Sequence, residues 1–124
     1  MDASLPDVVV LKSRIDPGEL GRLAQRFEGM VKYVVDVERC AIAVGGELHA
    51  DAEQRLLDQG SRPEDLWGAN YYPGRGGDGC IEYTSLINIR PSQDNRSMLI
   101  EGEGVRARVR EITFALIGRG EPLE

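Results

Sequence analysis

Two short runs of β-forming residues, at positions 31–37 and 41–44, place the tightest constraint on how this chain can fold. In the first run a hydrophobic side chain recurs at every second position, namely at Val31, Tyr33, Val35 and Val37. Side chains alternate between the two faces of a strand, so these four share one face. Only residues 38–40 separate the two runs, and Gly45 and Gly46 end the second. The pattern predicts two antiparallel strands joined by a tight hairpin.

Start and stop signals predict further elements along the chain. The continuous apolar run 8–11 predicts a strand that is buried on both faces. Residues 16–28 begin with Asp-Pro-Gly-Glu, carry an apolar stripe at helical spacing and precede Gly29, which together predict a helix. The same rules predict strands at 70–72 and 80–90 and helical segments at 51–59, 61–67 and 103–117.

The predicted order of elements is β-α-β-β-α-β-β-α. This order indicates an α+β fold, with about three helices covering one face of a mostly antiparallel sheet. The chain has 124 residues, of which 41% are hydrophobic and 29% charged, as is typical of a soluble globular domain. A chain of this length buries enough surface for one core, so residues 1–124 are predicted to form a single domain. Residues 119–124 are expected to be a frayed tail.

Charge and cysteine content narrow the classes of function. A net charge of −6 argues against a dedicated nucleic-acid binder, and a single histidine excludes HExxH zinc sites. Cys40 and Cys80 match no redox or metal motif, so we expect buried thiols. The N-terminus shows no secretion signal and no apolar run is long enough to span a membrane, which favours a cytoplasmic protein.

Residues 47–53 form the first candidate site, because they combine three carboxylates with the only histidine at a strand-to-helix junction. Glu47, His49 and Asp51 alternate, so an extended backbone would place them on one side. Such a set could bind a divalent metal ion, or His49 could act as a general acid or base; we assign no metal or cofactor. The structural alternative is that Asp51 caps a helix and His49 is a turn residue.

A strand end and loop at 88–97 form the second candidate site. Asn88 and Arg90 are expected to project from one strand face into a loop rich in hydrogen-bond donors. Guanidinium groups with amide and hydroxyl donors suit an anionic oxygen ligand such as phosphate or carboxylate. The alternative is a surface turn whose arginines pair with acidic residues of the middle segment. The candidate ligand-binding residues are Asn88, Arg90, Ser92, Asn95, Arg96 and Ser97.

Two further segments carry weaker signals. The loop 74–79 matches GxGxxG, but a strand follows it where a dinucleotide site needs a helix, so we expect a mobile hairpin loop. Trp67, Tyr71 and Tyr72 lie within six residues. If they are exposed, these rings suit a protein partner; if they are buried, they fill the core.

Four stretches, taken together, resemble a small, functionally uncharacterised family of bacterial proteins of similar length. They are VVDVE at 34–38, GGELHAD at 45–51, EDLWG at 64–68 and INIRPSQ at 87–93. The resemblance extends from about residue 10 to residue 117. It implies a bacterial origin and a stand-alone domain, and it carries over no activity and no catalytic residue.

These observations favour a domain that binds an anionic small molecule or an acidic partner segment through Arg90, Arg96 and the neighbouring amides. The alternative is a hydrolase of a phosphoester bond, with His49 as acid or base, Glu47 or Asp51 as its partner and Arg90 as charge stabiliser. A third hypothesis is a protein-interaction module built on the aromatic cluster. Nucleic acid and membrane are not expected partners, and self-association through an edge strand stays open.

Overall fold

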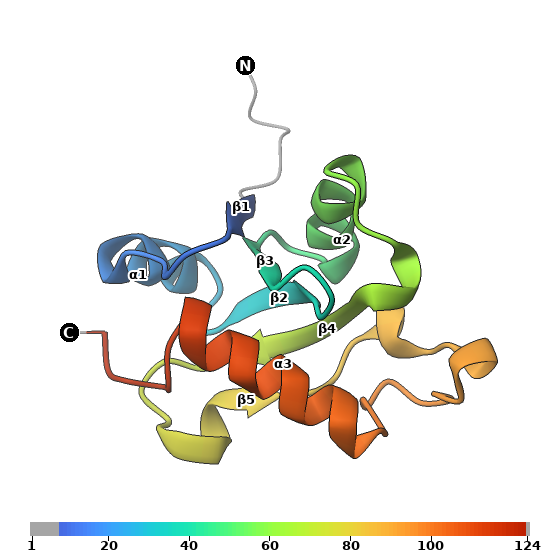
Figure 1. Ribbon diagram of the computed structural model, residues 1–124. Coiled ribbons are helices and arrows are strands. Elements are labelled where there is room, and N and C mark those ends of the chain that lie inside the picture. The colour runs from blue at the N-terminus through green and yellow to red at the C-terminus, as the bar shows by residue number, and fades with distance from the viewer. Residues whose placement is uncertain (1–7, 124) are drawn as a thin grey trace.

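In the computed structural model, which describes residues 8–123, five antiparallel strands form one sheet in the order β1-β3-β2-β4-β5 (Figure 1). The strands are β1 (Val8–Leu11), β2 (Val31–Asp36), β3 (Ala41–Gly45), β4 (Leu66–Tyr71) and β5 (Ile81–Glu82). The helices are α1 (Pro17–Arg26), α2 (His49–Asp58) and α3 (Glu103–Leu116). The predicted α+β class and element order are confirmed. Residues 1–7, on which the expectation about secretion depends, lie outside the described residues.

The predicted hairpin lies at the centre of the sheet, where β2 pairs with β3 on one side and with β4 on the other. Asp36 holds the turn at 37–40, because its Oδ1 accepts hydrogen bonds from two backbone N–H groups of the turn at 2.9 and 2.8 Å. Its Oδ2 accepts a hydrogen bond from the Ser61 hydroxyl at 2.6 Å. The buried Asp36 carboxylate therefore joins the hairpin to the loop that follows α2.

Helices cover both faces of the sheet, whereas the sequence pattern predicted helices on one face (Figure 1). α1 and α3 pack over the face that carries Tyr33 and Val44, and α2 packs over the face that carries Val34 and Ala43. β2 and β3 have apolar side chains at successive positions, so each face of the sheet needs its own cover. Within the described part of the chain no helix is long and apolar enough to cross a membrane.

The two N-terminal helices begin in different ways. Asp16 caps α1 as predicted, since its Oδ2 accepts hydrogen bonds from two backbone N–H groups of the first turn at 2.9 and 3.3 Å. α2 begins at His49, two residues before its predicted start, and Leu48 at the N-cap supplies no side-chain hydrogen bond. Asp51 therefore lies within the first turn, and the prediction that it caps the helix is wrong.

The helical turn predicted at 61–67 is a strand in its last part. A single 3₁₀ turn, Pro63–Asp65, precedes β4, which already begins at Leu66. All six residues of β4 pair with β2. This ladder decides the backbone conformation of Leu66 and Trp67, because tertiary pairing overrides a weak local helix signal.

The strand predicted at 80–90 ends at Glu82, and residues 83–101 follow an irregular path that includes two 3₁₀ turns. The Asn88 side chain occupies the place that a neighbouring strand would take. Its Oδ1 accepts a hydrogen bond from the Gly68 N–H at 2.9 Å, and its Nδ2 donates to the Gly68 carbonyl at 3.0 Å. A side-chain amide thus satisfies the backbone of β4 where the alternating pattern predicted a continuing ladder.

The residues after α3 run back beside the loop between β4 and β5. Gly120 is buried and donates its N–H to the Tyr71 hydroxyl at 2.7 Å. The Gly120 carbonyl accepts hydrogen bonds from the N–H groups of Gly74 (2.9 Å) and Gly76 (3.1 Å). Hydrogen bonds therefore hold this part of the predicted tail, 119–124, against the end of the sheet.

Candidate functional site

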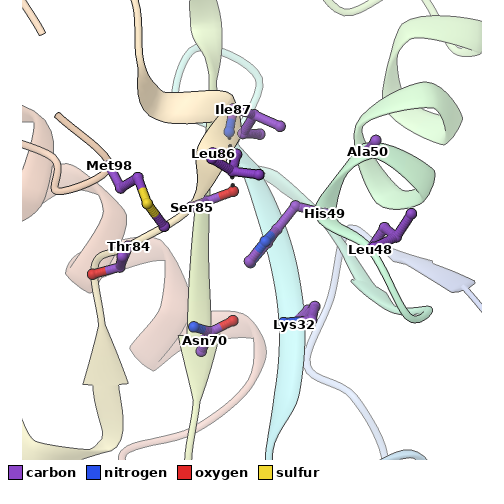
Figure 2. A pocket seen from close by; sticks show the side chains of 10 residues that line it. All are labelled: Lys32, Leu48, His49, Ala50, Asn70, Thr84, Ser85, Leu86, Ile87 and Met98. Atoms are coloured by element: carbon purple, nitrogen blue, oxygen red, sulfur yellow. Dashed lines mark hydrogen bonds between the residues drawn. The ribbon is translucent and has the colours of Figure 1, made fainter. Parts of the chain in front are cut away.

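A pocket of about 360 Å³ opens between the first turn of α2 and residues 84–98 (Figure 2). Lys32 and Asn70 rise from the sheet, whereas aliphatic side chains come from the turn of α2 and from the irregular segment. The pocket is lined by Lys32, Leu48, His49, Ala50, Asn70, Thr84, Ser85, Leu86, Ile87 and Met98. It therefore combines a polar floor with largely aliphatic walls.

The floor belongs to a row of three polar side chains on neighbouring strands. Lys32 of β2 pairs with Asn70 of β4, and Asn70 pairs with Glu82 of β5. Asn70 Nδ2 donates to Glu82 Oε1 at 2.9 Å, and the Tyr72 hydroxyl donates to the same oxygen at 3.0 Å. A carboxylate can only accept, so these bonds orient the Asn70 amide. Its Oδ1 is consequently directed toward the Lys32 side of the pocket (Figure 2).

Two groups of this row lack partners among the described residues. Asn70 is only 7% exposed, and its Oδ1 is buried with no hydrogen-bond partner. A buried acceptor left unpaired costs about 1–3 kcal/mol. Lys32 is half-buried, and no carboxylate in the described part of the chain forms an ion pair with it. The floor therefore presents an unpaired acceptor beside a cation that forms no ion pair with the described residues.

His49 reaches over the floor from the first turn of α2 (Figure 2). Its Nε2 lies 2.8 Å from the carbonyl oxygen of Ala69, which can only accept. Nε2 therefore carries the proton, and Nδ1 of the neutral ring is an acceptor. Burial disfavours the imidazolium and lowers the pKa of His49, and nearby Lys32 adds to this effect. The Ala69 carbonyl and, more weakly, the adjacent Asn70 side chain and the Glu82 carboxylate oppose it. The ring is neutral at pH 7.

We expect the ring of His49 to titrate below 6.5, the ordinary value for histidine, when its proton resonances are followed by NMR. Because the folded pKa is lowered, the contribution of His49 to stability is complete above the unfolded pKa. It is lost as the pH falls through 6.5 toward the folded value. Lys32→Met should raise the pKa of His49, whereas Lys12→Met, at the exposed second lysine, should leave it unchanged. A ring pKa at or above the ordinary value would contradict the burial of His49.

The walls of the pocket combine close backbone packing with exposed aliphatic side chains. Ser85 lies against β4, and a Cβ added at Gly68 would be 2.7 Å from Ser85 Cβ, so only glycine permits this approach. At the mouth of the pocket Leu48, Leu86 and Met98 are 61%, 71% and 40% exposed. Large exposed aliphatic side chains gathered around a cavity indicate a binding surface.

Comparison with protein families places this pocket within one family. The profile of a family described as a protein of unknown function, DUF5674, matches residues 9–116. The chain belongs to the DUF5674 family. All of the residues that line the pocket fall within the matched range, so the pocket is part of the DUF5674 domain. The expected resemblance to a functionally uncharacterised family is confirmed, and no curated protein and no solved structure matches the chain.

Of the carboxylates and the histidine of the first predicted cluster, only His49 lines the pocket of this DUF5674 protein. Glu47 is exposed ahead of α2, and Asp51 turns back toward β3, where a Cβ added at Gly46 would be 3.5 Å from Asp51 Cβ. The helix start at His49 removes the extended backbone that would place all three on one side. Among residues 8–123 as described, no group of three or more His, Cys, Asp or Glu side chains could hold a metal ion.

Two asparagines of the second predicted site bind the backbone. Asn88 is fully buried, and in addition to its two bonds with Gly68 its Nδ2 donates to the Met98 carbonyl at 3.0 Å. Asn95 Nδ2 donates to three carbonyl groups of the same segment at 2.8–3.1 Å, and its Oδ1 accepts from the Glu101 N–H at 2.8 Å. Both amides therefore shape the irregular segment that carries the pocket walls.

Arg90 packs against Trp67 and α2 and is not among the residues that line the pocket. Its guanidinium carbon lies 4.8 Å from the centre of the Trp67 ring, and its N–H groups donate to the carbonyls of Ile87 and Leu66. Glu53 Oε2 lies 3.9 Å from Arg90 Nη2. Burial lowers the pKa of Arg90, and Glu53 partly opposes this effect. The alternative in which both arginines of this loop pair with acidic residues of the middle segment is therefore met for Arg90 only. The described residues show no such ion pair for Arg96.

In the loop at 88–97, which was predicted to bind an anionic oxygen of a ligand, a carboxylate of the chain itself takes that place. Glu101 Oε2 accepts hydrogen bonds from the N–H groups of Arg96 (3.1 Å) and Ser97 (3.0 Å) and from the Ser97 hydroxyl (2.9 Å). These bonds favour the ionised carboxylate, so they lower the pKa of Glu101, the Ser97 hydroxyl most strongly. Ser92 is exposed on a neighbouring 3₁₀ turn.

The carboxyl of Glu101 is expected to titrate below its ordinary value of 4.5 in a ¹³C NMR titration. Because the folded pKa is lowered, its contribution to stability is present above the unfolded pKa and is lost as the pH falls through the folded value. Glu101→Gln should shift the amide resonances of Arg96 and Ser97 at neutral pH. Glu103→Gln, an exposed control at the start of α3, should leave both in place. An ordinary pKa for Glu101 would show that these three bonds are absent in solution.

Two predictions about burial have mixed outcomes. Trp67 and Tyr71 are buried in the core and Tyr72 is half-buried, so the core alternative is confirmed for the first two rings. The exposed aromatic patch that an interaction module would need is therefore missing. Cys80 is buried as expected, but Cys40 is exposed in the turn between β2 and β3. The prediction that both thiols are buried is wrong for Cys40.

No sequence pattern marks Lys32, Asn70 or Ser85 as site residues. Lys32 occupies an ordinary polar position in an alternating strand pattern, and Asn70 was placed at the start of a later strand. Only the register between β2 and β4 brings these two together. One available signal is that Lys32 is one of just two lysines in a chain with 15 basic residues.

Proposed function

We propose that this DUF5674 protein binds a small molecule that has an aliphatic body and an anionic group, in the pocket between α2 and residues 84–98. The observation that carries the proposal is Lys32, a half-buried residue that lines the pocket and has no carboxylate partner among the described residues. A ligand that fills the pocket would take the Lys32 cation further out of water, which is costly unless an opposite charge accompanies it. A ligand carboxylate or phosphate beside Lys32 would supply that charge.

The N-terminus of α2 supports the same ligand charge. Its first residues, Leu48, His49 and Ala50, line the pocket, and no side chain caps them. The first N–H groups of a helix have no partner within the helix and carry a partial positive charge, so they favour a nearby anion. Because the ring of His49 is neutral, the positive potential in the pocket comes from Lys32 and from the N-terminus of α2.

The walls and the size of the pocket specify the rest of the ligand. A volume of about 360 Å³ lies near the lower end of the range of small-molecule sites. Aliphatic side chains bury apolar ligand surface at about 25 cal/mol per Å². A body of a few carbon atoms next to the anionic group fits these dimensions.

A phosphoester hydrolase would use His49 together with Glu47 or Asp51 and with Arg90. Catalysis by these groups needs their side chains within hydrogen-bond reach of one substrate. Only His49 lines the pocket, and the Arg90 guanidinium donates to two backbone carbonyls. The geometry therefore supports binding better than hydrolysis.

The proposal can be tested by titrating the protein with 4-methylpentanoate, while the ring resonances of its single histidine report on the pocket. We expect saturable shifts and a rise in the pKa of His49, because a bound anion stabilises the imidazolium. Lys32→Met should weaken binding about tenfold, and the neutral analogue 4-methylpentan-1-ol should bind about tenfold more weakly than the carboxylate.

Matched variants separate the pocket from the rest of the surface. Lys12→Met removes the other lysine, and Leu99→Ser changes an exposed leucine that does not line the pocket, so both should leave binding unchanged. Leu86→Ser should weaken it. Arg96→Ala should also leave binding unchanged, because Arg96 does not line the pocket. The proposal fails if His49 resonances do not respond to 4-methylpentanoate, or if Lys32→Met and Lys12→Met have the same effect.

A further inference from the structure

Asn70 imposes a requirement on the ligand that a simple carboxylate does not meet. Its Oδ1 is buried in the pocket without a partner, while its Nδ2 is committed to Glu82. The Glu82 carboxylate cannot donate, so the amide cannot flip to use its oxygen there. A ligand that fills this pocket and brings no hydrogen-bond donor would leave the buried Asn70 oxygen unpaired, whereas a ligand that donates to it would relieve the cost of the unpaired acceptor and gain affinity.

The positive charge of Lys32 beside the Asn70 oxygen decides whether the hydrogen-bond donor of the ligand is charged or uncharged. Lys32 lies opposite Asn70 in the β2–β4 ladder, and the Asn70 oxygen is directed toward that side (Figure 2). An ammonium donor at this position would meet the Lys32 cation, whereas an uncharged N–H would not. The anionic group of the ligand belongs beside the same lysine. The ligand therefore carries an uncharged N–H next to its carboxylate.

We infer that the pocket takes an N-acylated aliphatic α-amino acid, whose amide N–H donates to Asn70 Oδ1 and whose carboxylate lies beside Lys32. This inference rests on the proposed function and names its ligand class. Acylation is what makes the nitrogen both uncharged and a donor, and the α-carboxylate is attached to the adjacent carbon. The exposed aliphatic side chains of Leu48, Leu86 and Met98 cover the ligand side chain at the mouth of the pocket.

Calorimetric titration of the full chain with four matched probes tests this inference. N-acetyl-L-leucine carries every required group, and 2-acetoxy-4-methylpentanoate replaces its N–H by an ester oxygen of nearly the same shape. N-acetyl-L-leucinamide lacks the carboxylate, and 4-methylpentanoate lacks the acylated nitrogen. We expect N-acetyl-L-leucine to bind about tenfold more tightly than either the ester or the amide. The tripeptide Ala-Ala-Leu carries the same terminal group, so its relative affinity shows whether the source is a small molecule or a peptide end.

Two variants assign each preference to a side chain. Asn70→Leu keeps the shape of the side chain and should abolish the preference for N-acetyl-L-leucine over the ester. Lys32→Met should abolish the preference over N-acetyl-L-leucinamide. Each variant is compared on two ligands, so a uniform change in stability does not affect the ratio. If Asn70→Leu does not fold, the comparison of N-acetyl-L-leucine with its ester on the wild-type protein still tests whether the ligand N–H is required.

The outcomes distinguish the inference from the function on which it rests. Equal affinities for N-acetyl-L-leucine and its ester, with both binding, would overturn the inference and leave carboxylate binding intact. Equal affinities for the acid and N-acetyl-L-leucinamide would overturn it as well, because the carboxylate would then have no role. If none of the three carboxylate probes binds, the inference and the proposed function fail together. A tenfold preference that persists in Asn70→Leu would also overturn the role assigned to Asn70.

Discussion

Replacing Asn88 by alanine is expected to lower the free energy of unfolding by about 4 kcal/mol. The Asn88 side chain is fully buried and bonds to the N–H and carbonyl of Gly68 and to the carbonyl of Met98. Alanine would leave the N–H and carbonyl of Gly68 without these partners, would remove one of the two donors to the Met98 carbonyl and would open a cavity beside β4. Equilibrium unfolding in urea, followed by circular dichroism, measures the effect. Since small domains are stable by about 5–15 kcal/mol, the loss is a large fraction of the total.

The control for Asn88 is Ser92→Ala, in the same segment but exposed. It should change the free energy of unfolding by less than about 0.5 kcal/mol. Asn88→Asp should be nearly as damaging as alanine, because a carboxylate cannot donate to the carbonyls of Gly68 and Met98. An unfolding midpoint for Asn88→Ala equal to that of the wild type would refute the structural role assigned to this amide.

Asp36→Ala is expected to destabilise the protein by about 3 kcal/mol. The buried carboxylate accepts hydrogen bonds from two N–H groups of the β2–β3 turn and from the Ser61 hydroxyl. Alanine removes all three bonds and leaves three donors without partners. Asp36→Asn keeps an oxygen for the turn, and the Ser61 hydroxyl can accept from the new NH₂ group, so this variant should lose about 1 kcal/mol.

The informative result is which of the two Asp36 variants loses more stability. Asp58→Ala removes an exposed carboxylate from α2 and should change stability by less than about 0.5 kcal/mol. In a double-mutant cycle Ser61→Ala and Asp36→Ala should be strongly non-additive, since the two side chains share a bond. If Asp36→Asn is as harmful as Asp36→Ala, the negative charge of Asp36 matters more than its bonds to the turn, and those bonds do not account for its stabilising effect.

Much of the fold follows from local sequence signals. The hairpin at 31–44 and the helices α1 and α3 could be predicted because periodicity and stop residues act within a few positions. The start of β4 could not, since Leu66 and Trp67 are strand residues only because β2 lies beside them. The end of β5 depends on a bond between Asn88 and the distant Gly68. Helices on both faces follow from the apolar residues at successive positions of β2 and β3.

The candidate site was harder to predict from the sequence than the fold, because its residues come from four separate parts of the chain. His49 was predicted from its rarity and its place before a helix, and it does line the pocket. The expectation that Asn88 and Arg90 project from one strand face had one origin, the assumption that residues 80–90 form a continuous strand, whereas β5 ends at Glu82. The same types of residue, amides and guanidinium groups, can bind the backbone in place of a neighbouring strand or can bind a ligand. Only the tertiary structure shows which of the two roles a given side chain has.

The exposure of Leu48, Leu86 and Met98 has a consequence for how DUF5674 proteins can diverge. Substitutions at exposed positions usually change stability by less than about 0.5 kcal/mol, whereas the amides that shape the same segment are buried. Under the function proposed above, substitutions at these three positions can change ligand selectivity while the buried scaffold residues stay the same. Substituting them in this protein should therefore alter which ligand it prefers without altering how it folds.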